Sequence, residues 1–314
     1  MASRFKRALR QRRARCERSA IALAHWLFTR RSRRQILRAA RWIGDAGWIL
    51  AHRHRRIAAA NLRVIYGDRL SERRRRALIR AHFRHAARVL LDVFWFAHDG
   101  QARTADWMTT EPSMLAWLDA HPSAVIVTGH IGNWEAAGQM AVARGYPLTS
   151  VAKRIGTPDT TTTLNRYRRS LGQKIVMSEG AVRGLVRALQ AKEYVALLLD
   201  QHVEPQQGGV WVNLFGLQAA VSSAAARLAR KFAVPVAVCF AQALPDGRYR
   251  CRLLGVCEAD ADDPVPMTQQ IMDLLARAIR RYPSQWLLSY KRWKRWPPGA
   301  AAGQYPFYAR PWRP

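Results

Sequence analysis

The hydrophobic residues beyond residue 100 follow two alternating patterns, short apolar runs and longer segments with helical periodicity. The apolar runs predict strands at 123–128, 148–152, 174–177 and 194–199, and later near 210–215, 235–242 and 248–255. The periodic segments predict helices at 133–143, 158–171, 180–191, 222–232 and 265–281. Strands and helices that alternate in this order form a largely parallel central sheet flanked by helices. We therefore predict an α/β fold.

The first hundred residues have a helical and basic pattern instead. Residues 1–66 repeat apolar side chains at helical spacing, and so does a second stretch that begins at Ser71, a preferred helix cap, and reaches about His98. We divide the chain into a basic amphipathic helical region at 1–105, an α/β domain at 106–296 and a tail at 297–314. The tail is rich in proline, aromatic residues and arginine, and it either lies along a membrane surface or covers the sheet.

The charge of the chain indicates an anionic partner. Its 314 residues include 52 Lys plus Arg against 21 Asp plus Glu, a formal net charge of +31. Residues 1–80 hold 24 of these basic side chains and only 4 of the acidic ones. A surface of this charge attracts nucleic acid, anionic lipid or an acidic protein, and the N-terminal quarter is the expected docking surface.

The residues between the arginines favour a membrane over nucleic acid. The apolar stretches 20–28 and 42–50 both contain Trp and Leu and alternate with arginine clusters, a composition typical of the bilayer interface. Both are shorter than the roughly 18 apolar residues that a membrane span needs. We expect an interfacial attachment, and no nucleic-acid partner because no recognition motif is present. Two alternatives remain. The apolar stretches could be ordinary core faces of amphipathic helices, or the chain could be a basic nucleic-acid-binding protein.

The four cysteines give no sign of a metal site. Cys16, Cys239, Cys251 and Cys257 lack metal-ligand spacing, and nothing in the sequence pairs them in disulfides. A reduced protein that faces the cytosol is the simplest interpretation.

A histidine and a carboxylate five positions apart follow the apolar run at 124–128. On one continuous helix His130 and Glu135 would lie about 140° apart around the axis, so the histidine must precede the helix. We predict a strand, a tight loop through Gly129 and Gly132, and a helix capped by Asn133. In that geometry Glu135 can fold back, accept one imidazole N–H and leave the other nitrogen free to take a proton.

This half of a catalytic triad lacks a nucleophile, because no Gly-x-Ser-x-Gly elbow is present. A hydroxyl of the substrate could take its place, in which case His130 would act as the general base of a direct acyl transfer. N–H groups from Gly132 to Trp134 are expected to stabilise the oxyanion. The alternative is a histidine that only satisfies hydrogen bonds within a strand–helix turn.

Polar side chains follow three of the predicted strands. Beyond His130, these are Lys153 and Arg154 after 148–152, and Asp200 after 194–199. Ligands of open α/β sheets bind at the carboxyl ends of strands, so a base, two cations and a carboxylate could meet an anionic substrate there. Solvation of the two cations and a structural capping role for Asp200 are the alternatives.

These residues resemble a known family, the lysophospholipid acyltransferase superfamily, and within it the bacterial lipid A late acyltransferases. The resemblance covers nearly the whole chain. Residues 129–135 are similar to the catalytic block, and residues 282–293 to the closing helix of the family. The other similar blocks are 55–62, 70–73, 200–201, 214–216, 228–230 and 235–236.

The resemblance implies that His130 is the base and Glu135 its partner. It also implies a thioester on acyl carrier protein as the acyl donor and a membrane glycolipid, a lipid A precursor, as the acceptor, with no cofactor or metal. The location implied is the cytoplasmic face of the bacterial inner membrane, with anionic lipids as partners. Another lipid acceptor, such as a lysophospholipid, a mannolipid or an amino lipid, stays open. The substrate contacts that we assign are Asn133, Lys153, Arg154, Arg169, Asp200 and Gly216.

Overall fold

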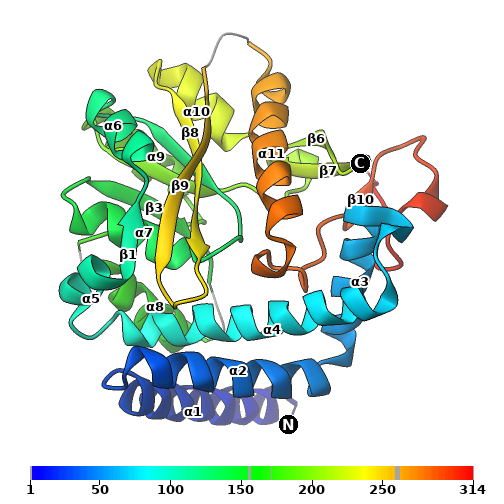
Figure 1. The fold of residues 1–314 in the computed structure, drawn as a ribbon. Coiled ribbons are helices and arrows are strands. Elements are labelled where there is room, and N and C mark those ends of the chain that lie inside the picture. Colours follow the sequence, from blue (N-terminus) through cyan, green and yellow to red (C-terminus); the bar gives the residue numbers. More distant parts are fainter. Residues whose placement is uncertain (1, 155–156, 171, 259–261, 314) are drawn as a thin grey trace.

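The computed structural model describes residues 2–154, 157–170, 172–258 and 262–313. Its N-terminal part is helical, as predicted, with α1 (Ala2–Phe28), α2 (Arg33–Leu50), α3 (His52–Tyr66) and α4 (Glu72–Trp95). Figure 1 shows α1 and α2 running beneath α4, on the side of that helix away from the sheet. Ser71 caps α4 as expected, since its side chain accepts a hydrogen bond from the N–H of Arg74 at 3.3 Å.

Close packing fixes α2 against α4. A Cβ atom at Gly44 would lie 2.4 Å from the Cα of Arg84, so only glycine allows this approach. Within the described residues, no helix is both long enough and apolar enough to cross a membrane.

The central sheet has seven strands in the order β1-β9-β8-β2-β5-β3-β4, and only the β8–β9 pair is antiparallel. The prediction of a largely parallel sheet is therefore confirmed. The strands are β1 (Met108–Thr110), β2 (Val125–Thr128), β3 (Leu148–Ala152), β4 (Lys174–Met177), β5 (Tyr194–Leu198), β8 (Val236–Ala243) and β9 (Tyr249–Cys257). The sequence did not predict β1, which has only three residues.

Helices cover both faces of this sheet because side chains along each strand alternate between two cores. Val125 and Val127 of β2 pack in one core with α3, α9, α10 and α11, whereas Ile126 borders the other core, which contains residues of α2, α4, α6 and α7. The helices are α5 (Gly100–Trp107), α6 (Pro112–Ala120), α7 (Trp134–Ala143), α8 (Pro158–Arg169), α9 (Ala181–Gln190), α10 (Ala224–Phe232) and α11 (Pro264–Arg281).

A separate antiparallel hairpin, β6 (Gly209–Leu214) and β7 (Leu217–Ser222), follows β5. The sequence predicted its first strand but not its second. The C-terminal tail packs on this hairpin and on α3: Tyr305 Oη accepts from the N–H of Gln218 at 3.2 Å, and Tyr308 donates to the side chain of Asn61. A short parallel pair joins the tail to the residues just before it, with β10 (Arg295–Trp296) beside β11 (Arg310–Pro311).

The prediction of a closing helix over 282–293 is wrong. This segment has one 3₁₀ turn, Pro283–Gln285, followed by irregular backbone. Pro283 has no N–H to donate to a helix. The chain after it bonds to the loop that follows β2 instead, where the N–H of Leu287 donates to the carbonyl of His130 at 2.8 Å.

Candidate active site

The loop that carries His130 connects β2 to α7, as the sequence predicted. Gly132 has φ +62°, and a Cβ atom there would lie 1.9 Å from the carbonyl oxygen of Ala241. Asn133 caps α7 through its side-chain oxygen, which accepts from the N–H of Ala136 at 3.0 Å. The glycine thus permits a turn that presses the loop against β8, and the cap starts the helix directly after it.

The carboxylate partner of His130 is Asp200, not Glu135. His130 Nδ1 lies 2.7 Å from Asp200 Oδ1. Each of the two residues stands two positions beyond the end of a strand, and β2 and β5 are parallel neighbours in the sheet. The expected pairing of His130 with Glu135 is therefore wrong. The parallel strands place Asp200, 70 positions away in the sequence, beside His130, whereas Glu135 in the first turn of α7 pairs elsewhere.

Asp200 is enclosed by donors. Its Oδ2 accepts from Trp286 Nε1 at 2.8 Å and from Arg292 Nη2 at 2.7 Å. Asp200, Trp286 and Arg292 are buried, with 1%, 0% and 2% of their surfaces exposed. Burial alone would raise the pKa of Asp200, but Arg292 and His130 outweigh it and hold that pKa well below its usual range. The carboxylate that faces His130 is therefore ionised.

An ionised Asp200 fixes the tautomer of His130. The imidazole donates through Nδ1–H to the carboxylate, which leaves Nε2 as the acceptor. Gln201 donates to this nitrogen, since its side-chain amide nitrogen lies 3.0 Å from His130 Nε2. The ring of Trp134 lies 4.9 Å from the imidazole, centroid to centroid. The histidine side chain is 15% exposed.

Glu135 belongs to a second ion pair on the other side of α7. Both of its carboxylate oxygens accept from Arg168 of α8, at 2.8 and 2.5 Å, and Arg168 also donates to Asn165 at 2.9 Å. Burial lowers the pKa of Arg168, but Glu135 outweighs this effect and raises it. The pair joins α7 to α8 and includes no atom of His130.

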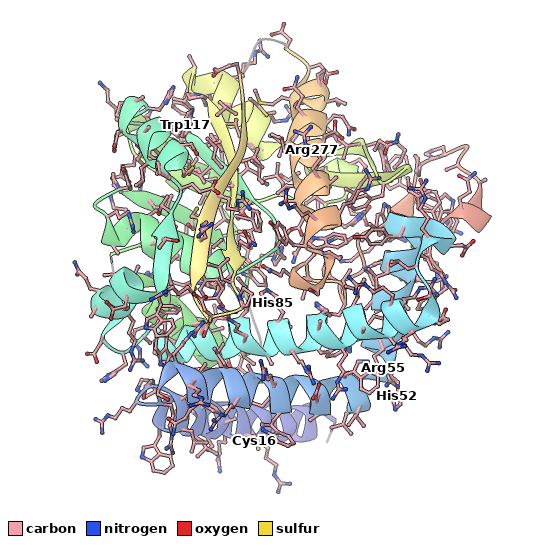
Figure 2. The ribbon with its side chains drawn as sticks, viewed as in Figure 1. Cys16, His52, Arg55, His85, Trp117 and Arg277 are labelled. Carbon is pink, nitrogen blue, oxygen red and sulfur yellow. The ribbon has the colours of Figure 1, made fainter. Side chains whose placement is uncertain are left out.

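The loop that carries His130 also forms hydrogen bonds with α4, with β8 and with the segment after α11. His85 of α4 bonds through Nε2 to the carbonyl of Gly132 at 2.9 Å, and Figure 2 shows its side chain on the face of α4 toward the sheet. Burial lowers the pKa of His85 to about 4, which keeps it neutral. The N–H groups of Gly132 and Asn133 donate to the carbonyls of Gln285 and Ala241, at 3.0 and 2.9 Å. These two groups are therefore not the free oxyanion donors that we expected.

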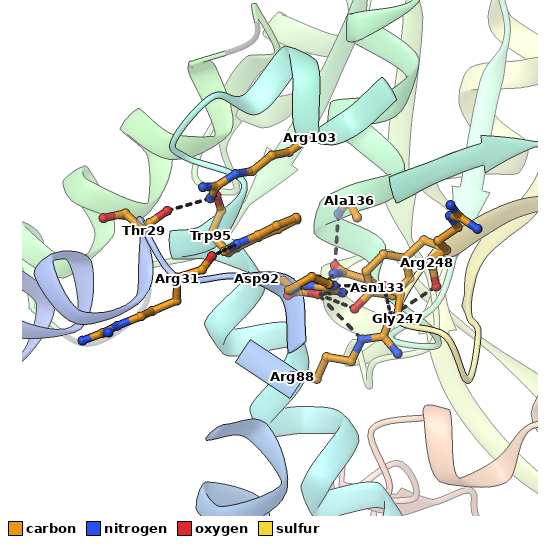
Figure 3. Close-up of polar contacts among 12 residues, drawn as sticks. Thr29, Arg31, Arg88, Asp92, Trp95, Arg103, Asn133, Ala136, Gly247 and Arg248 are labelled. Atoms are coloured by element: carbon orange, nitrogen blue, oxygen red, sulfur yellow. Dashed lines mark hydrogen bonds and ion pairs between the residues drawn. The ribbon is translucent and has the colours of Figure 1, made fainter. Parts of the chain in front are cut away.

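A buried network beneath the cap connects the loop to α2 and α4. Asp92 of α4 accepts from Asn133 Nδ2 at 3.4 Å, as Figure 3 shows, and also from Arg33 of α2 and the hydroxyl of Tyr249. Arg88, one turn earlier on α4, donates to the carbonyl of Gly247 at 2.8 Å. Asn133, predicted to contact substrate, is only 1% exposed and serves to anchor the helix.

The other predicted substrate contacts lie in varied surroundings. Lys153 and Arg154 follow β3, as expected, and both are exposed; Arg154 Nε lies 3.6 Å from Glu179. Arg169 donates to the carbonyl of Ile175 at 3.2 Å, and Gly216, with φ +88°, occupies the turn between β6 and β7. None of the described contacts joins these four residues to His130 or Asp200, so their binding roles stay predictions.

Sequence reasoning missed the roles of Gln201, Trp286 and Arg292. All three fall in blocks that resembled the family, 200–201 and 282–293, but the resemblance carried no assignment for them. The sequence offered no further signal, because an arginine among 52 basic residues is not conspicuous until the fold buries it beside Asp200.

Sequence similarity over most of the chain identifies the class of protein. The model of the bacterial lipid A biosynthesis acyltransferase family matches residues 19–295, and the chain belongs to this family. Its enzymes transfer acyl groups, and the chain is an acyltransferase.

Similar proteins include a phosphatidylinositol mannoside acyltransferase of Mycolicibacterium smegmatis, which is 26% identical over 222 residues, 69% of this chain and 72% of that protein. Proteins of the same name from two strains of Mycobacterium tuberculosis are 26% identical over 183 residues, 57% of either chain.

Proposed function

We propose that this enzyme transfers a fatty acyl group from a thioester, carried by acyl carrier protein, to a hydroxyl of a membrane glycolipid. The contact between His130 Nδ1 and Asp200 Oδ1, at 2.7 Å, carries the proposal. It leaves Nε2 as the nitrogen that carries the lone pair, which is what a general base requires. The strongly basic surface, +31 in total, suits an acidic carrier.

In the proposed reaction the acceptor hydroxyl takes the place of the Gln201 amide at His130 Nε2. Nε2 removes its proton as the oxygen attacks the thioester carbonyl, and Asp200 stabilises the imidazolium that forms. A bond from oxygen to the acyl carbon forms, the carbon–sulfur bond breaks, and the proton passes from Nε2 to the departing thiolate. No nucleophile of the protein is needed. Lys153 and Arg154 are proposed to bind phosphate on the acceptor.

Two acceptor classes follow from the comparisons. The description of the family favours a lipid A precursor, which we propose first. The names of the relatives favour a mannose-bearing phosphatidylinositol, the second candidate. Both acceptors combine a sugar hydroxyl with a phosphate and acyl chains, so the same base and the same type of apolar site would serve either one.

We also propose that α1 and α2 attach the enzyme to the cytoplasmic face of the membrane. Large apolar side chains are exposed on both helices: Leu23 and Trp26 on α1, and Trp42, Ile43, Ile49 and Leu50 on α2. Exposed tryptophan and leucine flanked by arginine are typical of interfacial helices. Trp42 and Leu50 are 77% and 76% exposed, which is costly in water and favourable at a bilayer.

The test is transfer by the purified enzyme from an acyl carrier protein thioester to a panel of acceptors, read as product masses. The panel contains a lipid A precursor, a phosphatidylinositol mannoside and a lysophospholipid. His130→Ala should abolish product with every acceptor while the circular dichroism spectrum stays unchanged. His121→Ala, directly after the end of α6, is the matched control. Transfer by His130→Ala near the wild-type rate would overturn the assignment.

A further inference from the structure

A basic pocket lies between α2 and α4, on the side of α4 away from the sheet. Its volume is about 390 Å³. The lining residues are Trp48, Arg76, Ala77, Arg80, Ala81 and Arg84. None of these residues takes part in the acyl-transfer site. The pocket is lined by one indole and three arginine side chains, and the guanidinium of Arg80 lies 5.7 Å from the indole ring.

Asp45 holds two of these arginines in fixed positions. Arg80 donates to it through Nε and Nη2, both at 2.8 Å, and Arg84 does the same at 2.7 Å. The two arginines lower the pKa of Asp45 well below its usual range, so this carboxylate stays ionised. Each guanidinium uses one edge on Asp45 and keeps its Nη1 for another anion. The side chains are thus held in place before any ligand arrives.

The pocket keeps a positive charge despite Asp45. Arg76, Arg80 and Arg84 carry three charges against one, and a fourth guanidinium, that of Arg55, lies 5.1 Å from the ring of Trp48. Arg80 lies 5.7 Å from the same ring. Arg55 stands near the start of α3, as Figure 2 shows. The indole therefore forms an apolar wall within a cationic site, which matches a phosphate attached to a less polar group.

The exposed apolar face of α2 lies to one side of the helix face that lines this pocket. Trp42 and Ile49, 77% and 56% exposed, are seven residues apart and lie within about 20° of each other around the helix axis. On the same side, Asp45, which holds two of the lining arginines, lies about 60° from Trp42, and Trp48, which lines the pocket, lies about 120° from it. If the apolar face enters a bilayer, the pocket comes to rest at the depth of the headgroups.

We propose that this pocket binds the phosphate of an anionic phospholipid headgroup while the apolar face of α2 contacts the acyl region. The proposal rests on the membrane attachment proposed above. An acidic protein could also meet three arginines, but the adjacent exposed Trp42 and Ile49 favour a lipid. Paired guanidinium forks bind phosphate in a defined geometry, so the site would select the headgroup rather than only respond to surface charge.

The test uses short-chain phosphatidylglycerol below its micelle concentration, because a lipid monomer has no surface potential. Calorimetry with the full chain should show saturable binding of one lipid. Arg76→Gln/Arg84→Gln should raise the dissociation constant about 30-fold, because each basic residue near an anionic headgroup contributes about 1 kcal/mol of binding free energy. Arg34→Gln/Arg38→Gln removes the same charge from the exposed surface of α2 and should leave affinity within about twofold. Arg80→Lys, which keeps the charge and loses the fork, should give an intermediate value.

Equal weakening by both double variants, or no binding by the wild-type chain, would overturn the proposal. Competition by glycerol phosphate at the same concentration would show that the site binds free phosphate rather than a lipid. Loss of acyl carrier protein binding in the pocket variant alone would show that the site binds an acidic protein. Either result would reject a lipid site. His130→Ala, which tests the proposed function, should bind the lipid as wild type does. Trp42→Ser/Leu50→Ser should no longer bind phosphatidylglycerol vesicles but should still bind the lipid monomer. Membrane attachment and the lipid site are thus tested by different measurements.

Discussion

Two carboxylates were candidate partners of His130, and their surroundings in the structure differ. Asp200 is 1% exposed, bonds to His130 and is held by Trp286 and Arg292. Glu135, five residues from His130 in the sequence, has a side chain that is 18% exposed and pairs with Arg168. The first carboxylate bonds to the imidazole of His130, the proposed base, and the second joins two helices. Distance along the chain is therefore a poor guide to which acid serves a base beside a parallel sheet.

Asp200→Asn should have the largest effect of the substitutions that test this difference between the two carboxylates. An amide cannot hold the imidazole as an ionised carboxylate does, so we expect kcat to fall by about 10⁴-fold. The substitution also leaves the buried Arg292 unpaired, which should lower the free energy of unfolding by about 3–5 kcal/mol. Thermal unfolding and transfer rates at low temperature would measure the two effects.

The matched control is Asp200→Asn/Arg292→Met, which removes the unpaired charge. Stability should return in the double variant, and activity should not. If activity recovered with stability, the loss in Asp200→Asn would be due to misfolding, and Asp200 would have no role in supporting His130.

Glu135→Gln should have a smaller effect on transfer. It breaks the pair with Arg168 and lets α7 shift, and displacement of a catalytic group by such a shift can cost up to about 10²-fold. The free energy of unfolding should fall by about 1–3 kcal/mol, because hydrogen bonds to a charged group are lost. Glu135→Gln/Arg168→Met should recover part of that stability. A loss of activity as deep as that of Asp200→Asn with an unchanged melting temperature would mean that Glu135 supports His130 after all.

The smallest expected effect concerns pH and the histidines of α4. Burial lowers the pKa of His82 to about 3 and that of His85 to about 4, against about 6.5 in an unfolded chain. Below pH 6.5 the unfolded chain therefore takes up protons that the folded chain does not. Stability from these groups is fully present above pH 6.5 and falls toward pH 4 by up to about 1.4 kcal/mol per pH unit for each histidine.

Denaturant unfolding of wild type and His85→Gln between pH 7 and pH 5 would measure this slope. The variant keeps an N–H for the carbonyl of Gly132 and should lose the contribution of one histidine. Aspartates titrate mostly below this window, since their unfolded pKa is about 3.9. An identical slope in both proteins would show that His85 is protonated in the folded state.

Most of the fold was predictable from local pattern. The bounds of β3 and β4 agree with the predicted runs at 148–152 and 174–177, because a buried parallel strand is a continuous apolar run between polar ends. The three-residue β1 and the second strand of the β6–β7 hairpin were missed. Residues 282–293 were assigned to a helix because of their resemblance to a family block, yet Pro283 and contacts with the loop that carries His130 decide their conformation.

The sequence by itself determined the alternation of strands and helices, the loop after β2 with its glycine and its Asn133 cap, and the identity of His130 as the candidate base. These features depend on residues within one or two turns of each other, so local chemistry specifies them. Only the tertiary structure decided that Asp200 faces His130, that Arg292 keeps that carboxylate ionised and that Glu135 belongs to Arg168. Such pairings join residues up to 92 positions apart, and strand order and burial, which no local pattern encodes, bring them together.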